Sequence, residues 1–151
     1  MRFDQTGEVL GFIERFHEDI ARAYVALGEK IPQRRAGLLL DYMSAREMAL
    51  ADAVRNFAHD SPDPALKEWD PFNVDDTAIR ARIKEGLHAE ASPDQLLSLG
   101  LDVAEWFEKL FVRLKAKSGT PEQKELFENL RERTEQEKHK LARNGNMLMD
   151  F

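Results

Sequence analysis

The chain has 151 residues, of which 42% are hydrophobic and 33% charged, and 22 Lys and Arg stand against 28 Asp and Glu, for a net charge of −6. This length is enough for one domain with a real hydrophobic core. The acidic balance argues against a nucleic-acid partner, because phosphate contacts need a basic surface. The chain has no cysteine, which excludes disulfides, thiolate nucleophiles and cysteine-ligated zinc or iron–sulfur sites.

Targeting and catalytic motifs are also missing. The first ten residues have no apolar core of signal-peptide length, and no stretch approaches the length of a membrane span. We therefore expect a cytoplasmic protein without a membrane partner. There is no Gly-x-Ser-x-Gly nucleophile motif, no phosphate-binding glycine loop and no Ser-x-x-Lys, so no motif indicates an enzyme.

The first predicted helix covers residues 6–29. Its apolar stripe has the alternating spacing of three and four that is typical of one buried helix face. The stripe consists of Leu10, Ile13, Ile20, Tyr24 and Leu27. His17 falls on the same face and is the one polar residue there, which makes it a candidate site residue.

The second predicted helix covers residues 33–58 and carries the strongest apolar stripe of the chain, from Ala36 to Phe57. Glu47 lies on this stripe, between Met43 and Leu50. A carboxylate inside a helical core is costly unless it is paired, hydrogen-bonded or bound to a cation. Glu47 is therefore the residue whose position most needs an explanation.

A long connection, residues 61–91, follows the second helix. It contains a short amphipathic helix with Ile79, Ile83 and Leu87 on one face. A connection of this length between two long helices predicts a crossover rather than a hairpin. The second and third long helices should therefore run roughly parallel.

The third and fourth long helices are predicted at residues 93–117 and 121–145. Each begins with the same pattern of Ser or Thr, Pro, an acidic residue and Gln, which is a capping box with Pro at the first helical position. The short links before the second and fourth helices predict two antiparallel hairpins. In the fourth helix the polar Thr134 and Glu137 interrupt the apolar stripe.

This order of helices, their lengths and the position of the crossover resemble the ferritin-like superfamily, and most closely its rubrerythrin-like branch. The resemblance implies an all-α, single-domain fold over residues 1–151: a four-helix bundle of two antiparallel hairpins joined by a long crossover with a short extra helix. In that family, Glu on the first and third helices and Glu-x-x-His on the second and fourth hold two irons.

The chain departs from the family pattern at five of its six ligand positions, and only Glu47 keeps the family residue. The six positions hold His17, Glu47, Leu50, Phe107, Thr134 and Glu137. The resemblance therefore implies that a conventional di-iron centre is lost, together with ferroxidase, peroxidase and oxygenase chemistry. We expect no cofactor and no catalytic residue.

Three interpretations of the remaining core residues stay open. The first is a metal-free, hydrogen-bonded cluster of His17, Glu47, Thr134 and Glu137 in a non-enzymatic binding or interaction module. The second is an altered mono- or dinuclear centre that binds iron, manganese or zinc through His17, Glu47 and Glu137. The third is a small-ligand pocket lined by Leu50, Phe107 and Thr134. Apolar strips outside the central seam further predict a homodimer or an unknown protein partner.

Overall fold

The computed structural model describes residues 1–61, 66–67 and 69–149. The described part is mostly helical, with one small two-stranded sheet, so the prediction of the all-α class is confirmed. No helix in this part is both long and apolar enough to cross a membrane.

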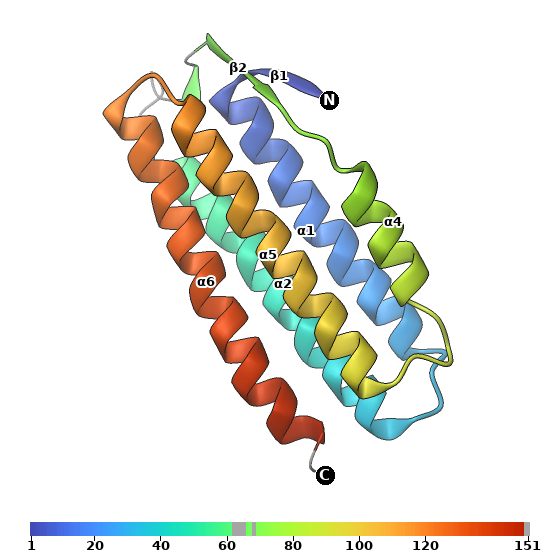
Figure 1. Ribbon diagram of the computed structural model, residues 1–151. Helices are drawn as coiled ribbons and strands as arrows, with labels where there is room; N and C mark the ends of the chain where they lie inside the picture. Colours follow the sequence, from blue (N-terminus) through green and yellow to red (C-terminus); the bar gives the residue numbers. More distant parts are fainter. Residues whose placement is uncertain (62–65, 68, 150–151) are drawn as a thin grey trace.

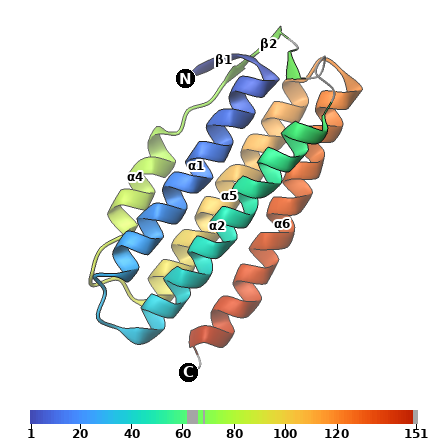
Figure 2. The same ribbon diagram turned by 180° about the vertical axis from the view of Figure 1, so that it is seen from behind.

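Four long helices lie side by side: α1 (Thr6–Gly28), α2 (Arg34–Asp60), α5 (Pro93–Lys117) and α6 (Pro121–Met149). Helices α1 and α6 run in one direction, and α2 and α5 run in the other (Figures 1 and 2). The crossover therefore leads to a parallel helix, as its length predicted, and each short link joins an antiparallel pair.

The two predicted capping boxes are present. The Ser92 hydroxyl accepts a hydrogen bond from the backbone N–H of Gln95 at 3.1 Å, and Gln95 accepts one from the N–H of Ser92 at 2.9 Å. Thr120 and Gln123 make the same reciprocal pair, both at 3.2 Å. These bonds satisfy backbone donors that a helix start would otherwise leave unpaired. Buried Gln123 also donates to the Thr6 hydroxyl at 2.7 Å, which ties the starts of α6 and α1 together.

The small sheet was not predicted. Strand β1 (Arg2–Gln5) pairs antiparallel with β2 (Trp69–Asn73), which lies inside the predicted crossover. The remainder of the crossover contains the expected short helix, α4 (Thr77–Gly86), with Ile79 and Ile83 buried. Helix α4 packs on α5 and lies alongside α1 (Figures 1 and 2).

The predicted end of the fourth long helix at residue 145 is wrong, because α6 continues to Met149. Gly145 is a packing residue here rather than a stop. A Cβ at this position would lie 2.7 Å from Leu97 Cδ1, so the missing side chain allows α6 to approach α5 closely.

The four long helices are not evenly spaced. Helices α2 and α5 approach each other at Gly100, where an added Cβ would lie 2.8 Å from Met43 Cε. Helices α1 and α5 are instead separated by aromatic rings. Trp106 and Phe107 each lie 5.5 Å from the Phe16 ring, centroid to centroid. Helix α4 lies on this aromatic side, because Phe16 and Trp106 each line a hollow together with residues of α4.

Candidate functional site

The structure brings two of the predicted site residues into direct contact. Nδ1 of His17, on α1, lies 2.6 Å from Oε2 of Glu47, on α2. The exposed fractions of the two residues are 1% and 7%. The Phe107 ring stacks on the imidazole at a centroid distance of 3.9 Å and an interplanar angle of 22°. The contact provides the partner that an inward carboxylate requires.

Glu137 is buried in α6, and its partners are arginine and lysine side chains, not His17. Its Oε2 accepts a hydrogen bond from Nη1 of Arg46 at 2.9 Å. Its Oε1 lies 3.3 Å from Nε of Arg133 and 3.6 Å from Nζ of Lys140. The long cationic side chains reach in from the surface to neutralise a carboxylate that is only 3% exposed.

Arg46 is the site residue that sequence reasoning missed. It sits one position before Glu47 in α2, beside the apolar stripe rather than on it, and its side chain is 31% exposed. The available signal was its position next to Glu47, because a buried carboxylate is expected to have a cation nearby. The distance to Glu137, 91 positions further along the chain, could not be inferred from local spacing.

Thr134 is buried and makes a bond within its own helix. Its hydroxyl donates to the Leu130 carbonyl at 2.8 Å, the back-bonding that a helical Thr commonly makes when no other acceptor is near. The four polar residues therefore do not form one hydrogen-bonded cluster. His17 pairs with Glu47, Glu137 pairs with Arg46 and Arg133, and Thr134 bonds within its own helix.

A small cavity joins these groups. Its volume is about 20 Å³, and Tyr24, Glu47, Leu50, Thr134 and Glu137 are among the residues that line it. A site of this size and polarity suits one water molecule or one ion and is too small for an organic ligand. Phe107 is not among its lining residues, since its ring covers the imidazole instead.

Tyr24 lines this cavity, and its buried hydroxyl has no hydrogen-bond partner in the described part of the chain. The residue is 1% exposed. Burial raises the pKa of the Tyr24 phenol well above its usual value, and the negative charge of Glu47 raises it further. A neutral, unpaired hydroxyl beside a water-sized cavity indicates that a guest in this cavity would accept a hydrogen bond from Tyr24.

The donors do not form a ready-made metal site. Among residues 1–61, 66–67 and 69–149, no group of three or more His, Asp or Glu side chains is arranged to hold an ion. Glu47 and Glu137 line one cavity, but each is already engaged by a positively charged or proton-donating neighbour. A metal would have to displace Arg46 from Glu137 or His17 from Glu47.

Comparison with protein-family models, curated proteins and solved structures finds no match to this chain.

Proposed function

We propose that the chain is a ferritin-like bundle that has exchanged metal chemistry for a binding or interaction role, in the cytoplasm and as a homodimer. The observation that carries this proposal is the contact of 2.6 Å between His17 Nδ1 and Glu47 Oε2. It supports the proposal because the one family ligand that survives, Glu47, is matched by an imidazole from the chain itself.

The charges around the other ligand positions support the same proposal. A cation site needs carboxylate oxygens that converge on one point without a fixed positive charge nearby. Here the Arg46 guanidinium lies 2.9 Å from Glu137, and two more cations lie within 4 Å of the same carboxylate. The remaining ligand positions hold Leu50, Phe107 and Thr134, of which the first two have no donor atom.

The test is metal analysis of protein purified without chelator and again after incubation with ferrous, manganous or zinc ions. We expect far less than one equivalent of each ion, with the same content in wild type, Glu47→Ala and the exposed control Glu132→Ala. One equivalent of ion that is lost in Glu47→Ala and kept in Glu132→Ala would overturn the proposal.

The cavity favours a second candidate, the altered metal centre. Glu47, Glu137 and Tyr24 all line the cavity, its volume suits a single ion, and the Tyr24 hydroxyl has no partner among the described residues. In this candidate His17, Glu47 and Glu137 would hold one iron, manganese or zinc ion. It predicts that the ion raises the melting temperature of wild type and not of Glu47→Ala.

Support for the homodimer comes from the α1–α2 hairpin, which exposes large apolar side chains. Val25 is 44% exposed, Leu38 37% and Met48 40%. Light scattering at tens of micromolar should give twice the monomer mass, and Leu38→Glu combined with Met48→Glu should give the monomer mass. A monomeric wild type would remove this part of the proposal.

A further inference from the structure

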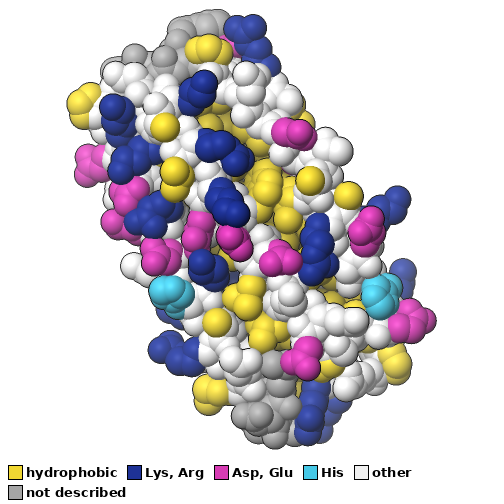
Figure 3. Space-filling view, viewed as in Figure 1, with side chains coloured by type: hydrophobic (Ala, Val, Ile, Leu, Met, Phe, Trp, Pro, Cys, Tyr) yellow, Lys and Arg dark blue, Asp and Glu magenta, His cyan; other side chains and the backbone are white. Residues whose placement is uncertain are grey.

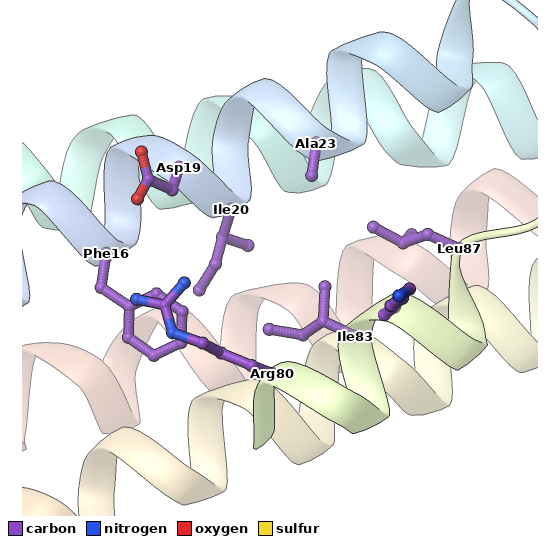
Figure 4. A pocket seen from close by; sticks show the side chains of 8 residues that line it. Phe16, Asp19, Ile20, Ala23, Arg80, Ile83 and Leu87 are labelled. Atoms are coloured by element: carbon purple, nitrogen blue, oxygen red, sulfur yellow. The ribbon is translucent and has the colours of Figure 1, made fainter. Parts of the chain in front are cut away.

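A larger hollow lies outside the core, between α1 and α4, and we call it the α1–α4 groove (Figure 4). Its volume is about 340 Å³, within the range of small-molecule sites. The apolar side chains that form it are Phe16, Ile20, Ala23, Ile83 and Leu87. On the face that carries α4 and α5, apolar surface shows between the rows of charged side chains (Figure 3).

The groove is elongated along the helices. Phe16, Ile20 and Ala23 lie on successive turns of α1, a span of about 10 Å at the helical rise per residue. Ile83 of α4 and Leu87, the residue that follows α4, lie opposite them, and Figure 4 shows both side chains in the space between the two helices. This shape suits a single extended apolar chain better than a compact ring system.

The rim of the groove carries a cation that the chain itself does not neutralise. Lys84 is exposed and makes no ion pair or side-chain hydrogen bond within the described residues. Arg80 pairs with Asp76, and its guanidinium carbon lies 4.3 Å from the centre of the Phe16 ring. The one acid at the rim, Asp19, is paired with Arg22. In a chain of net charge −6, this is a local excess of positive charge beside an apolar floor.

The neighbouring hollow between α4 and α5 lacks this combination. Its volume is about 280 Å³, but its two cations face acids of the chain. Arg82 pairs with Asp102 at 3.3 Å, and Lys109 pairs with Glu105 at 3.1 Å. Of these two neighbouring hollows, the α1–α4 groove is the one that combines an apolar floor with a cation that has no partner among the described residues.

We propose that the α1–α4 groove binds an anionic amphiphile, a carboxylate that carries one flexible apolar chain. The chain lies on the floor between Phe16 and Leu87, where burial of its methylene groups provides most of the affinity. The carboxylate lies at the rim, where Lys84 supplies charge complementarity. This inference rests on the proposed binding role and names its ligand class.

The fluorescence of Trp106 gives a direct readout, because its ring makes an edge contact with Phe16 at 5.5 Å. The chain has two tryptophans, so Trp69→Phe leaves Trp106 as the single reporter. We expect sodium decanoate, titrated below its micelle concentration, to change the emission in a saturable way with one equivalent bound. Nonyltrimethylammonium, which has the same nine-carbon alkyl chain and the opposite charge, should bind at least fivefold more weakly.

Two variants of the reporter protein locate the site. Lys84→Glu should weaken decanoate binding about fivefold, as expected for reversing a charge at a solvated rim. Its control is Lys124→Glu, the same charge change at an exposed position in the first turn of α6, which should leave binding unchanged. Ala23→Phe should fill the groove and weaken binding at least tenfold. Circular dichroism confirms that each variant is folded.

The inference is overturned if both amphiphiles bind equally, if Ala23→Phe binds decanoate like its parent, or if the chain binds phosphatidylglycerol vesicles but no decanoate. Its failure is distinct from failure of the proposed function. A stoichiometric metal ion would contradict the proposed metal-free role but not the proposal for the α1–α4 groove. Metal-free protein that binds no decanoate would contradict only the proposal for the groove.

Discussion

His17 and Glu47 face each other across the α1–α2 interface, with Nδ1 of the imidazole 2.6 Å from Oε2 of the carboxylate. Both side chains are almost fully buried, at 1% and 10% exposure. Burial of such a pair carries a free-energy cost of desolvation. The interaction offsets this cost only when both partners are present. Either residue alone would be a buried polar group without its partner.

Removal of one partner should therefore cost more than removal of both. We expect Glu47→Ala to lower the free energy of unfolding by about 3 kcal/mol, because it leaves the imidazole unpaired and a void behind it. The double variant His17→Leu with Glu47→Met should come within about 1 kcal/mol of wild type, since apolar replacement of a whole buried pair is often neutral.

Urea denaturation of wild type, His17→Leu, Glu47→Met and the double variant forms the thermodynamic cycle that checks this prediction. A coupling energy of at least about 1 kcal/mol is expected between the two positions. Strictly additive effects would show that the two side chains do not interact in solution.

Tyr24 supplies a second prediction, because its hydroxyl is buried and has no hydrogen-bond partner among residues 1–61, 66–67 and 69–149. Tyr24→Phe removes a group that the fold leaves unsatisfied, so the free energy of unfolding should rise by about 1 kcal/mol. The control is Tyr42→Phe, whose hydroxyl accepts a hydrogen bond from Asn144 at 2.9 Å and should give no gain. Destabilisation by Tyr24→Phe would instead mean that a guest in the cavity depends on this hydroxyl.

The raised pKa of Tyr24 predicts a loss of stability in alkali. The folded state keeps the phenol protonated, whereas the unfolded state releases the proton near pH 10. The free energy of unfolding therefore falls as pH rises above 10. Below pH 10 the phenol is protonated in both states, and Tyr24 causes no such loss. Denaturation between pH 8 and 11 should show a decline in wild type that is smaller in Tyr24→Phe; equal declines would contradict the raised pKa.

The sequence predicted the helices where local chemistry decides the structure. The capping boxes at Ser92 and Thr120 are local hydrogen-bond patterns, and both helices begin where these patterns indicate. Strand β1 was missed because a four-residue strand has little periodicity and its partner Phe72 lies far along the chain from Phe3. The end of α6 was missed because Gly145 is favoured by packing on Leu97 and not by a turn.

The candidate site was likewise predictable only in part. Helical periodicity placed His17 and Glu47 inward on adjacent antiparallel helices, and the structure brings them together. The same periodicity put Glu137 inward but said nothing about Arg46, whose side chain crosses from α2 to α6. The α1–α4 groove depends on where a short crossover helix docks, which the periodicity of that helix does not fix.

Glu128 gives a fourth prediction, on pH dependence at the α5–α6 interface. Hydrogen bonds from Arg131, together with Lys115, lower the pKa of Glu128 to about 2. Because the folded-state pKa is depressed, the stabilisation is present above the unfolded value of about 4.5 and is lost as pH falls toward 2. The carboxylate is 29% exposed, so solvent screening limits the effect to about 1 kcal/mol or less.

The comparison of wild type with Glu128→Gln tests this assignment. The difference in the free energy of unfolding should be largest at pH 6 and should shrink as pH falls from 4.5 to 2.5. Added salt should reduce the difference at pH 6, because the pair is partly solvated. A difference that is independent of pH would assign the stabilisation to packing of the Glu128 stem.

The last prediction concerns the close approach of α2 and α5 at Gly100. An added Cβ would lie 2.8 Å from Met43 Cε and 3.0 Å from Leu141 Cδ2, so both of these side chains would have to shift to admit it. Gly100→Ala gains helix propensity but forces these side chains to move. Overpacking outweighs the propensity gain, so we expect a net loss of about 1 kcal/mol in the free energy of unfolding.

Gly37 provides the matched control, because an added Cβ there meets no atom within 4 Å. Gly37→Ala should stabilise α2 by about 0.5–1 kcal/mol through helix propensity alone. Met43→Leu, which removes the Cε atom, should relieve much of the loss in Gly100→Ala when the two changes are combined. If Gly100→Ala stabilises the chain as much as Gly37→Ala, the contact between α2 and α5 is looser than the structure shows. The packing of Met43 against Gly100 would then not be what keeps the neighbouring core cavity small.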